Sequence, residues 1–521
     1  MLHHRPELAR VLVLLAAFVC AACGLVYELE LVALGGYLLG DSVTQTSVVL
    51  SVMVFAMGVG SLGVKRMAHR PATSFALVEC SLAVVGGLSV LLLYGSWAWL
   101  GGCQFAMVGL TCAIGLLIGA EIPLLMTLIQ RIRREEAGQA AADLFAADYV
   151  GALIGGLAFP FLLLPALGQA TGALLTGAVN ALAGAAVVLW LFRDEAAPRT
   201  RLLLWAGCGT VLVLLALATA FSGAIERAAR QALYGAPPRA AVQSRYGEIV
   251  LTGGPGTGPA RVPGRRPSPG GDPLRLYLAG RLAVCGTDEY RYHEALVHPA
   301  LAGGADRRVL LLGGGDGLAL REVLRHRGVD SVLLVTLDPA LPRLARTDPG
   351  LAALSGHAFA DPRVRVVAAD PLEWLRRPGP TGFDAVLADL PAPERAARGE
   401  YRSAEFYGLA AARLGPGGRL AVPAGAAGAG LWRVESGLRA VGLWTVPFPV
   451  AGGGPACDPA GSGATAAVLL AARDNPPSLG LAADAPPPRS LDPASLAAAA
   501  ARLAATRPER LPPPSTLLHP R

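Results

Sequence analysis

The chain has 521 residues, a formal net charge of +7 and 53% hydrophobic residues, with a mean hydropathy of +0.47. This hydropathy is too high for an ordinary soluble protein, and the apolar excess is concentrated before residue 223. The positive charge comes from arginine, and no basic stretch is interleaved with aromatic residues, which argues against a nucleic-acid partner. We therefore expect a membrane part followed by a soluble part.

Seven apolar runs before residue 223 are long enough to cross a bilayer. They cover residues 11–38, 43–64, 74–98, 101–129, 148–167, 170–192 and 202–222. The first run continues without a convincing cleavage site, so we expect an uncleaved first span. The pattern predicts a multi-pass protein of the cell membrane, in contact with lipid and typical of a bacterial inner membrane.

Basic residues decide the expected orientation of these runs. They cluster before the first run and after the second, fourth and sixth, which predicts a cytoplasmic N-terminus. Seven spans would then place the soluble part outside. The arginines after the last run favour a cytoplasmic soluble part instead, which is our expectation, although the orientation stays open at this point: Arg227, Arg230, Arg239 and Arg245.

Several polar residues lie in or beside the apolar runs: Glu28, Glu30, Glu79, Glu121, Asp148 and Asn180. Ionisable groups in a membrane are costly, so a functional site is one explanation. Helix capping or pairing within the bundle is the other. A set of glycines in the same runs indicates close helix packing: Gly58, Gly60, Gly115, Gly119, Gly151, Gly155 and Gly156.

Cysteine placement gives no sign of a disulfide framework or a metal site. Six of the eight cysteines fall in apolar runs, and only Cys285 and Cys457 lie in the soluble part. No CxxC pair and no metal-ligand spacing is present, so we expect no metal.

Composition divides the chain into four parts. We predict a multi-span membrane domain at 1–222, a linker at 223–243, a soluble domain at 244–475 and a Pro/Ala-rich tail at 476–521. The tail should contain one helix near 493–505. Residues 244–252 and 274–278 alternate as two paired strands, and the Gly-, Pro- and Arg-rich residues 253–273 between them should form a disordered loop.

Strands and helices alternate through the rest of the soluble domain. Strands are expected at 308–312, 331–336, 364–368, 384–388 and 418–422, and helices at 318–327, 340–346, 371–376 and 405–414. This order predicts an α/β fold with a doubly wound parallel sheet, preceded by a small β-hairpin region.

The first of these strands leads into a glycine turn at Gly313–Gly317. Glycine lets the backbone approach a ligand closely, and Asp316 places negative charge where a phosphate loop would want none. An acidic residue also follows each of the next three strands: Asp338, Asp370 and Asp389. Ligands bind at the carboxyl ends of such strands. One acid there usually caps the next helix, but four in register favour a shared cationic ligand.

Long ungapped segments resemble spermidine synthases, the polyamine aminopropyltransferase family, and in particular the branch fused to an N-terminal multi-span membrane domain. The resemblance is carried by residues 288–299, 313–323, 361–370, 383–391 and 404–407, and by 26–29, 38–42 and 119–123 in the membrane part. It implies a Rossmann-like fold of the methyltransferase type.

The family moves an aminopropyl group from decarboxylated S-adenosylmethionine to putrescine, which gives spermidine and methylthioadenosine. The resemblance implies that Asp389 accepts a proton, that Asp316 and His293 hold the amine or aminopropyl chain, and that Asp370 binds adenine. Tyr292 would line the same cleft. The other nucleoside-binding positions would be Gly313, Gly315, Gly317, Asp338 and Pro371.

The resemblance further implies a co-substrate rather than a bound cofactor, no catalytic metal, and a homodimer through the soluble domain. Several family positions are nevertheless replaced: Gly247, Ala279, Thr336, Ala392 and the segment 463–467. Thr336 and Ala392 stand where the family has acids, and losing one charged contact costs about 1.5–3 kcal/mol of binding. Activity could therefore be reduced.

Two other functions stay open on the residues alone. One is a non-enzymatic transporter or sensor of polyamines or related cations, with the soluble domain as a binding module and with Glu28 and Glu121 contacting the cation. The other is a methyltransferase that uses ordinary S-adenosylmethionine on the same fold.

Overall fold

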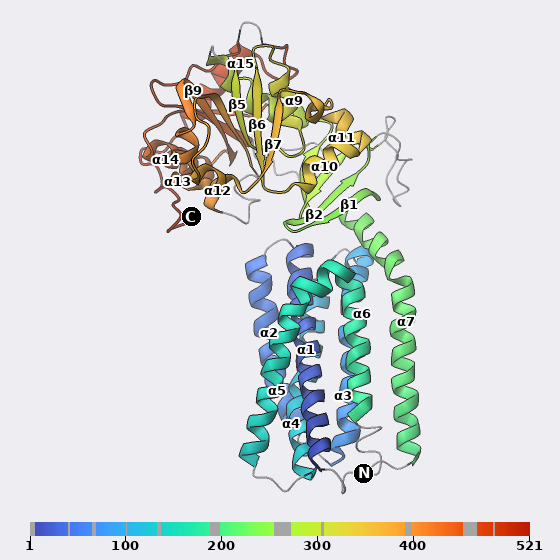
Figure 1. The fold of residues 1–521 in the computed structure, drawn as a ribbon. Helices are drawn as coiled ribbons and strands as arrows, with labels where there is room; N and C mark the ends of the chain where they lie inside the picture. Colours follow the sequence, from blue (N-terminus) through green and yellow to red (C-terminus); the bar gives the residue numbers. More distant parts are fainter. Residues whose placement is uncertain are drawn as a thin grey trace. The chain divides into compact units, whose positions relative to one another are not determined.

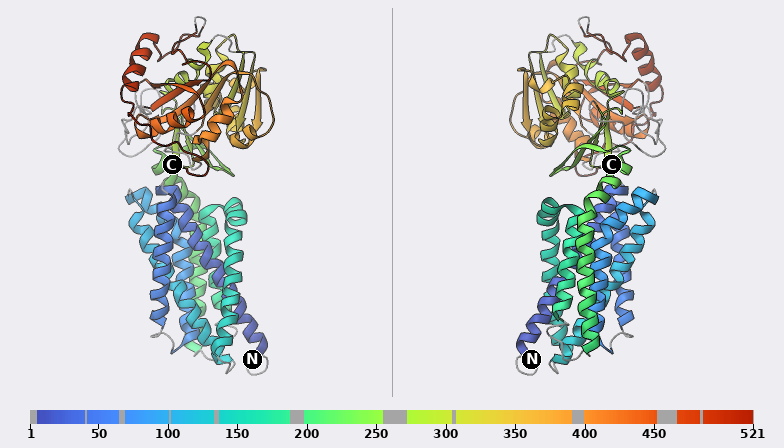
Figure 2. Two further views of the ribbon diagram at one scale, coloured as in Figure 1. Left: turned by 90° about the vertical axis from the view of Figure 1, so that its left-hand side faces the viewer. Right: turned by 90° about the vertical axis from the view of Figure 1, so that its right-hand side faces the viewer.

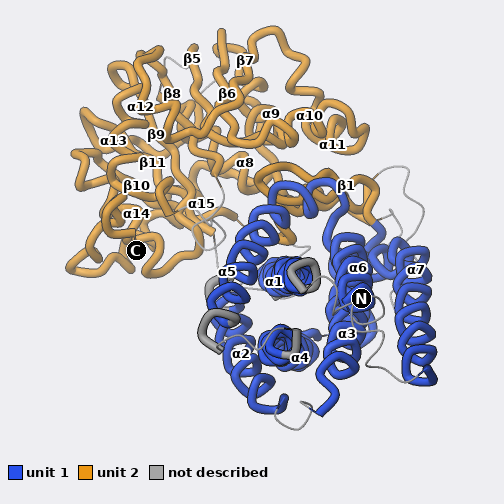
Figure 3. The backbone as a smooth tube through the Cα atoms, turned by 60° about the horizontal axis from the view of Figure 1, so that its bottom comes forward, with its two compact units in different colours: residues 1–237 blue, residues 238–521 orange. Residues whose placement is uncertain are grey.

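The computed structural model describes residues 6–39, 42–64, 69–100, 102–132, 137–187, 198–254, 272–303, 307–390, 399–451, 466–482 and 485–520. The chain forms two compact units, which we call unit 1 (Met1–Pro237) and unit 2 (Pro238–Arg521). Figure 1 shows helices alone in the described part of unit 1 and two sheets with helices in unit 2, and Figure 3 colours the two units separately.

Unit 1 is a bundle whose helices run alongside one another (Figure 2). Its helices are α1 (Pro6–Leu39), α2 (Ser42–Gly63), α3 (Pro71–Leu100), α4 (Gln104–Ile132), α5 (Ala137–Ala158), α6 (Leu164–Ala185) and α7 (Pro198–Tyr234). Large apolar side chains cover its outside, and Phe55, Phe161 and Leu203 are more than 70% exposed, at 73%, 79% and 72%. Such a surface is compatible with lipid contact.

Six described helical stretches are long and apolar enough to cross a membrane, compared with seven predicted spans. The difference arises at Ala141–Ala185, a stretch of 45 residues that contains the fifth predicted span and most of the sixth. Gly168 has non-helical backbone there (φ 74°), and Figure 1 shows the chain rising along α5 and returning along α6. At 1.5 Å per residue, one straight helix of this length would far exceed a bilayer core.

Close helix packing in unit 1 is confirmed at most of the predicted glycines. A Cβ on Gly119 would lie 2.0 Å from the carbonyl oxygen of Met57, and one on Gly151 would lie 2.1 Å from that of Phe18. The pairs α2–α4 and α1–α5 therefore approach backbone to backbone. Gly58 is an exception, because a Cβ there would meet open space.

Residues 223–243, expected to be a linker, are instead mostly regular structure. Helix α7 continues to Tyr234, and strand β1 (Pro238–Ser244) follows almost at once. The residues after 222 are rich in Ala, Glu, Arg, Gln and Leu, which have high helix propensity. Glu226 and Arg230 also form an i,i+4 ion pair.

Unit 2 begins with a four-stranded antiparallel sheet in the order β1-β2-β3-β4. After β1 its strands are β2 (Gly247–Thr252), β3 (Arg275–Leu278) and β4 (Arg281–Cys285). Strands β2 and β3 pair as predicted. The loop expected at 253–273 lies, except at its ends, outside the described residues. Cys285 is disulfide-bonded, although the sequence indicated no disulfide framework.

The β3–β4 hairpin has a two-residue turn, Ala279–Gly280, with φ of 48° and 77°. Positive φ at both positions favours Asn-Gly. Replacing Ala279 by asparagine should therefore stabilise the protein by roughly 1 kcal/mol, since alanine is strained there. Thermal unfolding of the full-length protein should show a higher Tm for Ala279→Asn and a lower one for Ala279→Val. An unchanged or lower Tm for the asparagine variant would contradict the turn assignment.

The second sheet of unit 2 has seven strands in the order β10-β11-β9-β8-β5-β6-β7. They are β5 (Arg308–Gly313), β6 (Ser331–Thr336), β7 (Val364–Ala368), β8 (Phe383–Asp389), β9 (Leu414–Ala426), β10 (Trp444–Pro449) and β11 (Ala466–Ala472). The five strands β5–β9 are parallel, as predicted, but β10 and β11 run antiparallel to their neighbours. The doubly wound sheet is therefore mixed at one edge.

Both faces of this sheet are buried. Val309 and Leu311 of β5 belong to one apolar core, and Leu310 and Leu312 belong to the other. The helices of unit 2 are α8 (Glu289–Val297), α9 (Leu318–Leu324), α10 (Ala340–Thr347), α11 (Pro349–Leu354), α12 (Pro371–Arg376), α13 (Ala404–Ala411), α14 (Ala429–Ala440) and α15 (Pro493–Ala504). The last of these is the helix expected near 493–505.

Candidate active site

The glycine turn after β5 lies against the end of β8. Gly313, Gly314 and Gly317 have φ of 92°, 66° and 84°, and the Gly314 N–H donates to the Asp389 carbonyl oxygen at 3.0 Å. A Cβ on Gly313 would lie 2.0 Å from that same oxygen. The glycines therefore permit a left-handed backbone and a close approach between two strand ends. Gly315, in the same turn, faces the hydroxyl of Thr336.

Three of the four predicted acids accept a hydrogen bond from the first turn of the helix that follows them, and Asp370 is the N-cap of its helix. Asp316 accepts a hydrogen bond from the Leu318 N–H at 2.9 Å, and Asp338 accepts one from the Ala340 N–H at 2.9 Å. Asp370 accepts from the N–H of Leu372 at 2.8 Å, just after Pro371 in the first turn of α12. The local explanation therefore holds for these three carboxylates, and each can contribute negative charge to a ligand as well.

Asp389 differs from the other three. One carboxylate oxygen, Oδ1, accepts a hydrogen bond from the Tyr292 hydroxyl at 3.1 Å, and the other, Oδ2, is buried with no hydrogen-bond partner among the described residues. A Cβ on Gly314 would lie 3.1 Å from Oδ2. A side chain at position 314 would therefore crowd this oxygen, and glycine leaves the space beside it free of protein side-chain atoms.

The structure brings three predicted residues together. One ring nitrogen of His293 and one carboxylate oxygen each of Asp316 and Asp389 all lie within 4.8 Å of one another. They come from α8, the glycine turn and the end of β8. Asp338 and Asp370 follow β6 and β7 along the same sheet edge, outside this three-residue cluster.

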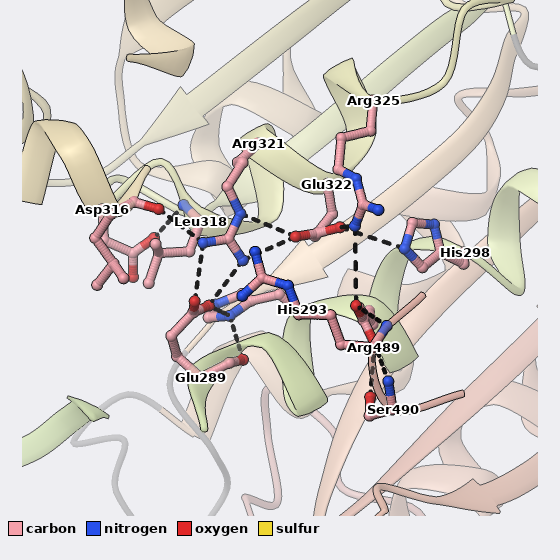
Figure 4. A network of polar contacts seen from close by, with 12 residues as sticks. Glu289, His293, His298, Asp316, Leu318, Arg321, Glu322, Arg325, Arg489 and Ser490 are labelled. Atoms are coloured by element: carbon pink, nitrogen blue, oxygen red, sulfur yellow. Dashed lines mark hydrogen bonds and ion pairs between the residues drawn. The ribbon is translucent and has the colours of Figure 1, made fainter. Parts of the chain in front are cut away.

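Glu289, which the sequence analysis did not single out, fixes the position of His293. The His293 Nδ1–H donates to the Glu289 backbone oxygen at 2.7 Å and to its carboxylate at 3.0 Å. Arg321 of α9 holds the Glu289 carboxylate from the other side, with contacts of 2.8 and 3.0 Å (Figure 4). The i,i+4 spacing of Glu289 and His293 on one helix was the available signal.

The polar network continues away from the site through Glu322 (Figure 4). The Glu322 carboxylate is fully buried and contacts Arg321, Arg325 and His298. Next to it, Glu294 of α8 accepts hydrogen bonds from the backbone N–H groups of Arg489 and Ser490, at 2.7 and 2.9 Å. The predicted tail is therefore bound to the helix that carries Tyr292 and His293.

Tyr401 is a second residue with no sequence signal. Its hydroxyl donates to the Asp370 carboxylate at 3.0 Å, so Asp370 has a partner on each oxygen. Tyr401 belongs to a short 3-10 helix, Gly399–Arg402, that follows residues outside the description.

The pKa values of both Asp389 and His293 are raised above their usual values. Burial and the nearby charge of Asp316 raise the pKa of Asp389 to about 6, although His293 and the Tyr292 hydroxyl act to lower it. Burial would lower the pKa of His293, but its hydrogen bond to Glu289 and the charges of Asp389 and Asp316 raise it to about 9. At neutral pH a charged imidazolium therefore offsets two carboxylates, and Asp389 titrates near the operating range.

Two positions where this chain departs from the resembled family lie side by side. Gly247 has φ 136°, and a Cβ there would be 3.2 Å from the Cβ of Ala279. A larger side chain at 247 would be both strained and crowded. Thr336 is the third replaced position: it is buried and faces Gly315, so a hydroxyl group lies where the resembled family has an acid. Ala392 and most of 463–467 lie outside the described residues.

Known proteins match this chain over most of its length. A model of the spermine/spermidine synthase domain matches residues 289–425. Polyamine aminopropyltransferase 2 of Streptomyces coelicolor is 53% identical and covers 99% of this chain and 94% of its own. The chain belongs to the polyamine aminopropyltransferase family.

Two more aminopropyltransferases support the assignment. Polyamine aminopropyltransferase 1 of Streptomyces coelicolor is 48% identical over 95% of this chain and 90% of its own, and that of Mycobacterium tuberculosis H37Rv is 44% identical over 85% and 83%. These matches extend across both units, so the helical unit is part of the shared architecture. They favour an aminopropyltransferase over the transporter, sensor and methyltransferase alternatives.

Proposed function

We propose that unit 2 transfers the aminopropyl group of decarboxylated S-adenosylmethionine to putrescine or a related amine, with Asp389 as the base. The observation that carries this proposal is the unpartnered, buried Oδ2 of Asp389, beside Asp316 and His293. Both substrates are cations, and carboxylates bind ammonium and sulfonium groups by charge-assisted contacts. No resident cofactor takes part, because the sulfonium already activates the carbon and leaves as a neutral thioether.

The step is a single displacement. The attacking ammonium first gives one proton to Asp389, which frees the lone pair of its nitrogen. The nitrogen then forms a bond to the terminal carbon of the aminopropyl chain, while the carbon–sulfur bond breaks and its electron pair stays on sulfur. The sulfonium becomes the neutral thioether of methylthioadenosine, and the product nitrogen remains a secondary ammonium. Tyr292 donates to Asp389 and orients it, while Asp316 and His293 set the charge around the amine chain.

The nucleoside would lie along the same sheet edge. Asp338 and Asp370, at the ends of β6 and β7, would bind the polar groups of the nucleoside. Pro371 would lie beside the adenine ring. The part of the donor that carries sulfur would lie against the glycine turn, at Gly313, Gly315 and Gly317. Tyr401 would keep the Asp370 carboxylate in place.

The rate of transfer should fall when the pH is lowered below about 6. The pKa of Asp389 is raised to about 6, so below this pH the carboxyl is protonated and cannot accept a proton. We expect kcat/KM to rise as pH increases through about 6 and then to level off. Initial rates of methylthioadenosine release between pH 5 and pH 8 would check this. A rate that is constant or falls over this range would contradict the assignment of the base.

We propose that unit 1 anchors the protein in the cell membrane and that unit 2 faces the cytoplasm. The donor is made in the cytoplasm, and because it is a cation it cannot readily cross a bilayer. The start of α1 and the end of α7 lie at opposite ends of the bundle, so this requires an outside N-terminus (Figure 1). The basic loops and the disulfide at Cys285 favour the opposite orientation.

Two reporters fused to the C-terminus would decide the orientation, one that works only in the cytoplasm and one that works only outside it. We expect the cytoplasmic reporter alone to be active, and activity of the external reporter alone would overturn this placement.

A further inference from the structure

A cluster of metal-ligating side chains lies inside unit 1, apart from the site of aminopropyl transfer. Cys20 of α1, Glu79 of α3 and Glu121 of α4 each bring one ligand atom within 4.8 Å of the other two. These residues are 1%, 0% and 4% exposed. The three atoms therefore converge in the interior of the helix bundle, within three separate candidate spans.

A fourth helix adds an amide to this cluster. Asn180 of α6 is fully buried, and its Oδ1 has no hydrogen-bond partner. Its amide nitrogen lies 3.5 Å from the Glu79 backbone oxygen, and Cys20 and Asn180 both lie beside the Glu79 carboxylate without completing hydrogen bonds to its oxygens. A thiol and two carboxylates from three helices therefore converge, and an amide from a fourth helix lies beside one of the carboxylates.

Within the described part of the chain, no positive charge balances the two buried carboxyl groups of the cluster. Both carboxylate oxygens of Glu79 and Oε1 of Glu121 are buried without hydrogen-bond partners, and no described basic side chain forms an ion pair with either residue. Leaving buried carboxyl groups unpaired costs several kcal/mol. A cation at the centre would contact the Cys20 sulfur and one oxygen each of Glu79 and Glu121.

The chemistry of the donors favours a metal ion over an organic cation. The three side chains are at most 4% exposed, which leaves no open path for an alkylammonium chain, whereas a single dehydrated metal ion needs only ligand atoms that lie close together, as these do within 4.8 Å. Thiolate with carboxylate and amide oxygen suits first-row divalent transition ions such as Zn²⁺. We propose that Cys20, Glu79 and Glu121, with Asn180, bind one divalent transition metal ion that joins four helices of unit 1.

This site was not predictable from the sequence, in which we expected no metal. Its residues are separated by about 40 to 60 positions and follow no ligand motif. Glu30 provides a matched control, because it also lies on α1, is fully buried and has two unpartnered carboxylate oxygens, but stands outside the cluster.

The test uses full-length protein purified in detergent with a tag that contains no histidine. Metal content is measured as purified, and chelator-treated protein is then titrated with Zn²⁺ and with Co²⁺ as a spectroscopic probe. The variants are Cys20→Ser, Glu79→Gln and Glu121→Gln, with Glu30→Gln as control. A wild-type helical circular dichroism signal and a single size-exclusion peak in detergent report that unit 1 of each variant has folded.

We expect about one ion per chain in the wild type and in Glu30→Gln, and a thiolate-to-cobalt absorption band that Cys20→Ser removes. Loss of a residue that only hydrogen-bonds to a metal ligand lowers metal affinity roughly 10- to 100-fold. Glu79→Gln and Glu121→Gln remove a ligand itself and should lower metal affinity by more than this. Cys20→Ser is nearly isosteric, so it remains informative if a glutamine variant does not fold. Absence of bound metal in the wild type, or equal binding by wild type and Cys20→Ser, Glu79→Gln and Glu121→Gln, would overturn the proposal.

Discussion

Replacing Asp389 by asparagine is expected to lower kcat/KM for aminopropyl transfer by about 10²–10⁴-fold, the usual contribution of general base catalysis. Asparagine keeps the shape of the side chain and can still accept the Tyr292 hydrogen bond through its carbonyl oxygen. It cannot take a proton from the attacking amine. The loss should therefore appear chiefly in kcat, with the fold unchanged, and is measured from initial rates at pH 8.

Tyr292→Phe is the matched control for this variant. It removes only the hydroxyl that donates to Asp389, and that hydrogen bond acts to lower the pKa of Asp389. The pKa should rise in the phenylalanine variant, so the low-pH limb of the rate profile should move to higher pH. The plateau rate should change by less than about tenfold, as loss of one hydrogen bond would allow. A near wild-type rate in Asp389→Asn would remove Asp389 from the mechanism.

Replacing Arg321 by methionine should have the largest effect on stability, about 3–5 kcal/mol. The arginine joins the carboxylates of Glu289 and Glu322, whose side chains are 2% and 0% exposed. Methionine fills similar space but leaves two buried charges with fewer partners, although Glu322 keeps Arg325. His293 should also lose its fixed position, because Glu289 would no longer be held from the far side.

The control is Arg376→Met. Arg376 pairs with Glu373 three residues earlier, but both side chains are about half exposed, at 45% and 53%. Exposed pairs contribute only about 0–1 kcal/mol. Denaturant unfolding followed by a probe in unit 2 should separate the two variants clearly. Equal losses of stability in both would show that the Arg321 network does not contribute as a buried pair.

Much of unit 2 was predictable because parallel strands are buried on both faces and read as short apolar runs. Strands β6 and β7 and helix α12 fall at the predicted residues. The antiparallel edge was not predictable, because no pattern within β10 or β11 records which neighbour each strand will join. The end of α7 was missed for a different reason: helix propensity continued after hydrophobicity had ended.

The candidate site was predictable only as a set of positions. Strand-end acids could be read from the chain, but all four looked equivalent there. Only tertiary structure shows that Asp316, Asp338 and Asp370 each accept a hydrogen bond from the start of a helix, while Asp389 keeps a buried oxygen without a partner among the described residues. The contact of Tyr401 with Asp370 joins residues 31 positions apart, which no local pattern predicts.

The same limit applies to unit 1. Hydrophobic length was enough to locate the spans, and glycines marked the close helix pairs correctly, apart from Gly58. The polar residues within the spans were recognised as unusual, but the sequence did not show which of them meet. Glu79 and Glu121 converge with Cys20, whereas Glu28, which the transporter alternative named together with Glu121 as a cation contact, lies outside that cluster.

The most direct test of the account is product analysis with the full-length protein. Purified protein is incubated with decarboxylated S-adenosylmethionine and putrescine at pH 8, and both products are quantified by mass spectrometry. We predict that methylthioadenosine and spermidine form in equal amounts, and that both are lost in Asp389→Asn. Folded protein that binds the donor but forms neither product with putrescine or related amines, or releases methylthioadenosine without an aminopropylated amine, would contradict it.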